Sequence, residues 1–313
     1  MARSTSSSVA VPETSTRGVS GSSVALNLFL SLRPAQWTKN LLVFAGLLFG
    51  RRLLDPAAVG EAIAAFAVFC ALSGVVYLVN DLVDREADQR HPLKQARPIA
   101  SGALPVRVAV AGAAIIGAAA LAAAFRLGTG LGTVAVAYVL LQAAYSLALK
   151  NIVILDVLAI AIGFVLRAVA GAVAVRVEIS HWLFVCTILL ALFIALAKRR
   201  HEIVLLAGDA ALHRPILGEY SAYLLDQMIA IVAACTLISY VFYTISPETS
   251  EKFGSQWLGL TIPFPLYGIL RYLYLIHQRE GGGSPADLLL ADRPLLTCVA
   301  LWAAAVAILI YRP

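Results

Sequence analysis

The feature that most constrains this chain is a succession of apolar segments, each about 20 residues long, that fills most of the sequence after residue 35. A helix of about 20 apolar residues crosses a lipid bilayer. Residues of the set AVILMFWYC make up 60% of the chain and charged residues 13%, against roughly 25% charged residues in soluble domains. These values exclude an ordinary soluble enzyme, and they predict an all-α, polytopic integral membrane protein.

The apolar segments predict about nine membrane-spanning helices, near residues 36–50, 58–80, 104–125, 130–149, 152–175, 181–198, 222–246, 257–277 and 293–311. The Arg33-Pro34 step predicts a short interfacial helix at 24–32 before the first span. Residues 1–24 are rich in Ser and Thr, which predicts a disordered cytoplasmic tail and not a cleavable signal peptide. We expect residues 25–313 to form a single transmembrane domain.

The basic residues predict the orientation of these spans. Sixteen of the 24 Lys and Arg residues fall on the side of the three longest connections, 81–103, 199–221 and 278–292, and six fall on the other side. This asymmetry predicts an odd number of spans in the cell membrane, with the N-terminus and the long connections in the cytoplasm. Nucleic-acid binding is not expected, because the basic residues are dispersed over short loops.

An acidic cluster follows the second predicted span. Asp81, Asp84 and Asp88 are three and four residues apart, so a helix places them on one face. Carboxylates this close repel one another unless a cation sits among them. Ligands that are all oxygens favour Mg²⁺ over zinc, which makes Asn80, Asp81, Asp84 and Asp88 the predicted magnesium ligands. The alternative is a solvated acidic helix end.

Basic residues follow this cluster at once, at Arg90, Lys94 and Arg97. A bound metal and neighbouring cations together suit a diphosphate group. Alternatively, these cations serve only to fix the membrane topology.

Residues 80–88 (NDLVDREAD) and 97–102 (RPIASG) resemble the first aspartate-rich motif of the UbiA family of membrane transferases. The resemblance implies about nine helices around a central cavity that opens to the cytoplasm, a Mg²⁺ cofactor and a diphosphate-bearing donor. Residues 32–44, 145–150 and 197–202 resemble the decaprenyl-phosphate phosphoribosyltransferase branch of this family. That branch implies phosphoribosyl pyrophosphate as donor, decaprenyl or another polyprenyl phosphate as acceptor, and a product used for cell-wall arabinan.

One difference between this sequence and the prenyl-transferring members of the family favours the phosphoribosyltransferase branch. Prenyl-transferring relatives have a second aspartate-rich motif after the sixth span, often DxxxD. Here the acidic residues of that loop, Glu202 and Asp209, are seven apart and follow Lys198, Arg199 and Arg200. A cationic loop suits a phosphate monoester better than a second metal-bound diphosphate. Alternatively, Lys198, Arg199 and Arg200 serve only to anchor the end of the span at the cytoplasmic side.

Polar residues inside spans are costly and point to function. Asp156 is placed to line the donor site, whereas Arg167 is equally consistent with structure and function, and Arg271 is expected to be structural. We predict Asp81, Asp84 and Lys39 as catalytic residues. The predicted substrate-binding residues lie at the mouths of the spans and in the loops: Gln36, Lys39, Asn40, Lys94, Arg97, Tyr145, Lys150, Asp156, Arg199 and Arg200.

The predicted reaction needs no general base, because the acceptor phosphate is already anionic. Mg²⁺ would neutralise the departing pyrophosphate, and the transition state would have oxocarbenium character. The prenyl tail would lie in membrane lipid. Two alternatives stay open: a prenyltransferase that moves a prenyl group from a diphosphate to an aromatic ring, and a secondary transporter, for which no repeated pair of interrupted spans is visible.

Overall fold

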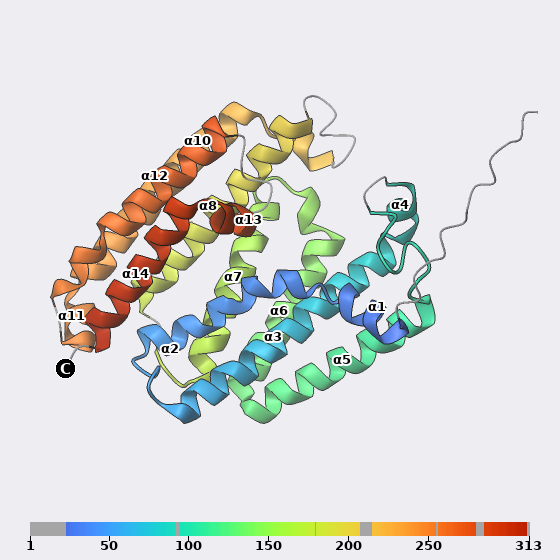
Figure 1. Ribbon diagram of the computed structural model, residues 1–313, viewed down its shortest axis with the longest axis horizontal. Coiled ribbons are helices and arrows are strands. Elements are labelled where there is room, and N and C mark those ends of the chain that lie inside the picture. Colours follow the sequence, from blue (N-terminus) through green and yellow to red (C-terminus); the bar gives the residue numbers. More distant parts are fainter. Residues whose placement is uncertain are drawn as a thin grey trace, which may run out of the picture.

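The computed structural model describes residues 23–91, 94–178, 180–206, 215–254, 256–279 and 285–311, and within these ranges it contains helices and no strand (Figure 1). Nearly all of the predicted tail, residues 1–22, lies outside the described residues. The predicted interfacial helix is present as α1 (Val24–Ser31), which Ser23 caps by accepting a hydrogen bond from the Leu26 amide.

Eight helices of the described chain are long and apolar enough to cross a membrane. They are α3 (Pro56–Val83), α5 (Val106–Leu127), α6 (Thr129–Leu147), α7 (Leu155–Ala174), α8 (His181–Leu206), α10 (Ala222–Ile245), the pair η4 (Trp257–Thr261) and α12 (Pro263–Gln278), and α14 (Arg293–Tyr311). Shorter elements are α4 (Arg85–Arg90), η2 (Leu149–Asn151), η3 (Pro215–Glu219), α11 (Pro247–Phe253) and α13 (Pro285–Ala291).

The first predicted span differs from expectation. Residues 36–50 are not one α-helix but a 3₁₀ helix, η1 (Pro34–Phe44), followed by the short helix α2 (Ala45–Phe49). A 3₁₀ helix rises about 2.0 Å per residue and an α-helix about 1.5 Å, so these 11 and 5 residues reach about 30 Å. A continuous α-helix of the same 16 residues would reach only about 24 Å, less than the hydrocarbon thickness.

This stretched segment runs antiparallel to α3. Arg33 contacts Asp81 near the end of α3, Asn40 contacts Ser73, and the Phe44 ring lies 5.3 Å from the Phe66 ring. The chain therefore passes along the bundle once before its eight long helices. The described residues thus contain eight long spanning helices where about nine spans were predicted, because this first passage is short and broken.

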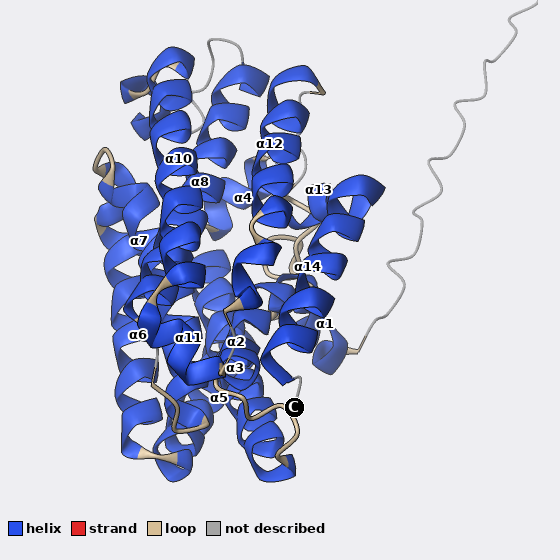
Figure 2. Cartoon of the chain, turned by 90° about the vertical axis from the view of Figure 1, so that its left-hand side faces the viewer, coloured by secondary structure: helices blue, strands red, loops and turns tan. Residues whose placement is uncertain are grey.

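Two apolar cores are joined by α7, which packs against α6 on one side and α8 on the other (Figures 1 and 2). Phe69, Leu131 and Tyr138 belong to the core that η1, α3, α5 and α6 share with α7. Leu196 and Ile229 belong to the core that α8, α10 and α12 share with it. Large apolar side chains remain exposed on the outer faces, as expected for helices in contact with lipid.

Polar contacts define the two ends of the bundle. We call the end that carries Asp81 the aspartate end. There, Ser146 at the end of α6 donates to Asn80 of α3, and Tyr220 before α10 donates to Asp156 at the start of α7. At the far end, Arg52 donates to the Val175 carbonyl after α7.

Candidate functional site

The aspartate cluster lies where α3 meets α4. The Asp84 amide donates to the Asn80 carbonyl at 2.9 Å and the Asp88 amide to the Asp84 carbonyl at 2.8 Å, so the helical turn continues across the junction. Asp81 and Asp88 are buried, with 4% and 3% of their surface exposed, whereas Asp84 is exposed. The three carboxylates are therefore close in sequence but lie in different environments.

Two arginines neutralise the buried aspartates. Nη1 of Arg97 donates to Oδ1 of Asp81 at 3.0 Å and to Oδ2 of Asp88 at 2.6 Å. Nη2 of Arg33 donates to the same Asp81 oxygen at 2.5 Å, and its guanidinium lies over the Tyr77 ring. Arg97 was predicted to bind phosphate, but here it is the ion-pair partner of the predicted metal ligands. Arg33 is not among the predicted site residues, although it stands directly before Pro34 at the start of the first predicted span.

The predicted magnesium ligands are only partly brought together. Within the described ranges, no three His, Cys, Asp or Glu side chains form a group that could hold a metal ion. Oδ1 of Asn80 accepts a hydrogen bond from Ser146 at 3.0 Å. Asp81 and Asp88 nevertheless converge on one positively charged nitrogen of Arg97. Two buried carboxylates around one cation are a donor set that suits a hard divalent ion, so these residues fit the predicted metal.

Lys39 and Lys198 reach the same region from η1 and α8. Nζ of Lys39 lies 3.5 Å from the Tyr77 hydroxyl, and Nζ of Lys198 lies 3.9 Å from Glu202. Lys39 makes no ion pair among the described residues, so its positive charge suits an anionic ligand.

Gln36 and Asn40, two further predicted binding residues on η1, differ in burial. Gln36 is half-buried near the aspartate end, but Asn40 is completely buried inside the bundle. Its Oδ1 accepts from Arg167 at 2.7 Å and its Nδ2 donates to Ser73 at 3.1 Å. Asn40 therefore does not line the mouth as predicted, because the wider spacing of the 3₁₀ helix places it deeper.

Asp156 and Arg199, two of the predicted substrate-binding residues, form a buried ion pair with one another. Nε of Arg199 donates to Asp156 at 2.8 Å, Nη1 to Glu202 at 2.6 Å and Nη2 to Tyr145 at 3.4 Å. The Tyr220 hydroxyl donates to the other Asp156 oxygen at 2.8 Å. Burial raises the pKa of Tyr220 to about 12, so this phenol stays a neutral donor. The protein itself therefore satisfies Arg199.

The remaining predicted binding residues are dispersed. Arg200 is paired with Asp226 of α10 and donates to the Ile276 carbonyl of α12. It therefore lies against α10 and α12 and not at the aspartate cluster. Lys94 is exposed before Arg97, and Lys150 is half-buried on η2. Glu202 is engaged by Arg199 and Lys198, and Asp209 lies outside the described residues.

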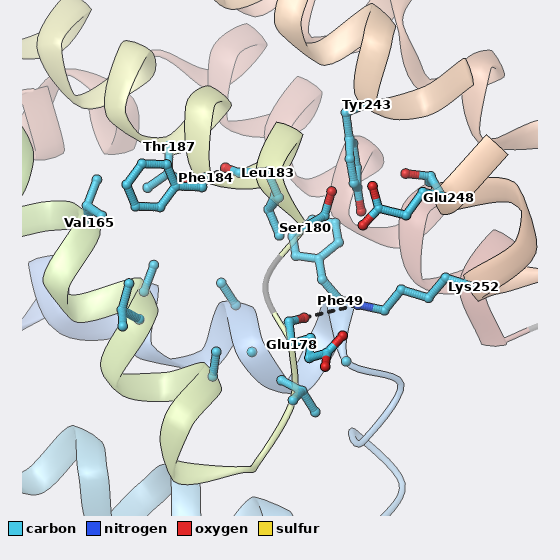
Figure 3. A pocket seen from close by; sticks show the side chains of 18 residues that line it. Phe49, Val165, Glu178, Ser180, Leu183, Phe184, Thr187, Tyr243, Glu248 and Lys252 are labelled. Carbon is cyan, nitrogen blue, oxygen red and sulfur yellow. Dashed lines mark hydrogen bonds between the residues drawn. The ribbon is translucent and has the colours of Figure 1, made fainter. Parts of the chain in front are cut away.

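A pocket of about 40 Å³ lies at the far end of the bundle (Figure 3). Its floor is apolar, with Phe49, Leu183 and Phe184, and Glu248 and Lys252 belong to its polar lining. The Lys252 ammonium donates to the Glu178 carbonyl there. Asp81, Asp84 and Asp88 do not line this pocket, so it is distinct from the aspartate cluster.

The sequence matches the model of the "UbiA prenyltransferase family" over residues 40–291. It is 32% identical to a decaprenyl-phosphate phosphoribosyltransferase of Corynebacterium glutamicum over 92% of this chain and 88% of that protein. It is 33% identical to the protein of the same name from Mycolicibacterium smegmatis over 91% of this chain and 92% of that protein.

Solved structures show the same fold. The structure of a UbiA homologue from Archaeoglobus fulgidus bound to GPP and Mg²⁺ superposes with a TM-score of 0.70 at 21% identity, over 92% of this chain and 99% of that one. A structure of digeranylgeranylglyceryl phosphate synthase superposes with a TM-score of 0.65 at 17% identity, over 91% of this chain and 99% of that one.

Proposed function

Because this chain belongs to the UbiA prenyltransferase family, a family of membrane proteins with several spans, we propose the following activity for it. It transfers 5-phosphoribose from phosphoribosyl pyrophosphate to decaprenyl or another polyprenyl phosphate and releases pyrophosphate. The observation that carries the proposal is the similarity, at 32–33% identity and over about nine-tenths of both chains, to decaprenyl-phosphate phosphoribosyltransferases. Residues 25–313 act as one transmembrane domain in this proposal.

The geometry at the end of α8 supports this activity over prenyl transfer to an aromatic ring. In prenyl-transferring relatives, this position carries a second aspartate-rich motif. Glu202 is instead engaged by Arg199 at 2.6 Å and by Lys198 at 3.9 Å, so its charge is already compensated. Among the described residues, the carboxylates at this end of α8 are therefore paired with arginine or lysine and do not form a second open cluster for a metal-bound prenyl diphosphate.

The buried aspartates would hold Mg²⁺ in this proposal. Asp81 and Asp88 supply the inner carboxylates, Asp84 is exposed one helical turn from Asp88, and Asn80 can join by releasing Ser146. When bound, Mg²⁺ neutralises negative charge on the departing pyrophosphate. Arg97 would leave the two carboxylates and bind the donor's diphosphate, which keeps its guanidinium paired with an anion throughout.

The lysines and the orientation of the bundle complete the proposal. Lys39 and Lys198 would orient the phosphate groups so that the acceptor oxygen faces C1 of the ribose. Gln36, Lys94 and Lys150 are kept as further binding residues. We place the aspartate end and the N-terminus on the cytoplasmic side of the cell membrane, because a water-soluble donor must reach the site while the prenyl tail stays in lipid. The product would serve the synthesis of cell-wall arabinan.

The test is an assay with purified protein, labelled phosphoribosyl pyrophosphate, Mg²⁺ and decaprenyl phosphate. We expect label in the lipid extract, no label when Mg²⁺ is chelated, and a strong loss in the Asp84→Asn variant. Parallel reactions contain geranyl diphosphate and 4-hydroxybenzoate. Turnover of the prenyl diphosphate without any transfer of phosphoribose would refute the proposal and establish the aromatic prenyltransferase instead.

A further inference from the structure

Arg167 is a buried cation that has only neutral partners among the described residues. It lies on α7 with 6% of its surface exposed. Nε donates to Oδ1 of Asn40 at 2.7 Å, Nη1 to the Gly163 carbonyl at 2.9 Å and Nη2 to the Tyr138 hydroxyl at 2.8 Å. These groups orient the guanidinium but leave its charge uncompensated.

Lys39 adds a second uncompensated charge next to Arg167. The polar partner of its ammonium is the Tyr77 hydroxyl at 3.5 Å. Lys39 directly precedes Asn40, which accepts from Arg167, and the other cation that contacts Tyr77 is Arg33. In the described ranges, no carboxylate lies within ion-pairing distance of Lys39 or Arg167, in contrast to Arg33, Arg97 and Arg199.

Neighbouring cations inside a membrane bundle are unfavourable without an anion. Burial removes the water that would stabilise each charge, and the low dielectric strengthens the repulsion between them. Beside the guanidinium there is space for one further methyl-sized group. A Cβ atom built on Gly163 would meet only the Nη1 atom of Arg167 at 3.6 Å and the amide of Gln142 at 3.8 Å.

We propose that Lys39 and Arg167 form a binding site for one phosphate monoester group, deeper in the bundle than the aspartate cluster. Asp81, Tyr77 and Ser73 follow one another at intervals of four residues on α3. Each interval corresponds to about 6 Å along the axis. Lys39, which contacts Tyr77, therefore lies about 6 Å below Asp81, and Asn40 with Arg167 lies about 12 Å below it.

Phosphate is the anion that this pair fits best. A guanidinium offers a planar set of donors and an ammonium adds a point charge, which together match a tetrahedral dianion. Asn40 fixes the guanidinium plane and Tyr77 fixes the ammonium, so both are positioning residues. If the proposed function holds, the phosphate is either the 5-phosphate of the donor or the phosphate of the lipid acceptor.

The test uses the purified full chain in nanodiscs and measures binding without turnover. The probes are ribose 5-phosphate, decaprenyl phosphate and inorganic phosphate. We expect Lys39→Gln and Arg167→Gln to weaken binding of inorganic phosphate and of one of the other two probes at least about tenfold, because a charged hydrogen bond is lost. Lys39→Arg and Arg167→Lys should restore part of the affinity. The matched control is Arg271→Gln, since Arg271 lies in a span but is paired with Asp292.

The probe whose binding affinity falls in the variants identifies the source of the phosphate. Loss for ribose 5-phosphate assigns the site to the donor, and loss for decaprenyl phosphate assigns it to the acceptor. Unchanged affinity for all three probes in folded Lys39→Gln would overturn the proposal. Binding of inorganic phosphate that depends on Lys39, in a protein that transfers no phosphoribose, would refute the proposed function and leave this site intact.

A second measurement separates a ligand site from a structural role. Removal of one of two repelling cations should raise the melting temperature of the ligand-free protein in Lys39→Gln. Phosphate should raise the melting temperature of the wild type over chloride of equal ionic strength, but not that of the variant. A lower melting temperature in both buffers would mean that Lys39 supports the fold, and it would count against the proposal.

Discussion

The guanidinium of Arg199 donates a 2.8 Å hydrogen bond to the carboxylate of Asp156, and neither side chain exposes more than 2% of its surface. This contact joins α8 to the start of α7 across 43 residues of sequence. It pairs two charged residues that are both among the predicted substrate-binding residues. In this the pair differs from Lys39 and Arg167, which make no ion pair among the described residues.

Asp156→Asn should destabilise the protein strongly. The substitution leaves the Arg199 charge buried with only Glu202 as its ionic partner, and breaking a buried pair costs about 3–5 kcal/mol. Thermal unfolding in detergent measures the effect. Asp226→Asn is the control, because the Arg200–Asp226 pair is more exposed and such pairs contribute about 1 kcal/mol or less. Equal losses in both variants would contradict the structural role of Asp156.

Arg97→Gln should increase the affinity of the donor-free protein for a divalent ion. Arg97 competes with the metal for Asp81 and Asp88, so its removal frees both carboxylates. Titration with Mn²⁺ followed by electron paramagnetic resonance measures the affinity. Arg90→Gln is the matched control, since Arg90 is exposed and has no ion-pair contact with the two aspartates among the described residues. A similar change in both variants would show a general charge effect and not competition.

Asp84→Asn should reduce activity without affecting stability. Asp84 is exposed and no ion pair involves it within the described ranges, so its loss should change the free energy of unfolding by no more than about 0.5 kcal/mol. Loss of a metal ligand should reduce turnover at least about tenfold. Glu86→Gln, an exposed substitution on α4, is the control. Full activity in Asp84→Asn would remove Asp84 from the metal site.

Gly171→Ala should disrupt the packing of η1 on α7. A Cβ atom at this position would lie 1.8 Å from the Val43 carbonyl oxygen, so the two segments must separate, at a cost of about 1–3 kcal/mol. Gly60→Ala is the matched control, because Gly60 lies inside α3 with no atom within 4 Å of the new Cβ. It should stabilise by about 0.5–1 kcal/mol. Similar melting temperatures for both variants would contradict the close approach.

The long helices were predictable because hydropathy is a local property. The predicted ranges 58–80, 104–125 and 222–246 lie within a few residues of α3, α5 and α10. The conformation of residues 34–49 was not predictable in this way. Its apolar content indicates a span, but the choice of a 3₁₀ helix depends on the contacts with α3 and α7 that stretch it to the length of the bundle.

The sequence by itself determined that the chain lies in a membrane, which family motifs it has, and where its acidic cluster lies. Apolar segment length and residue spacing suffice for these, since both act over one or two helical turns. Only the tertiary structure decided which charges are compensated. Arg199 forms an ion pair with Asp156, and Arg97 forms ion pairs with Asp81 and Asp88. Arg167 meets the neutral amide of Asn40, 127 residues away. Such pairings depend on which helices are neighbours. Spacing along the chain therefore cannot distinguish a cation that is paired with a carboxylate from one that has no anionic partner.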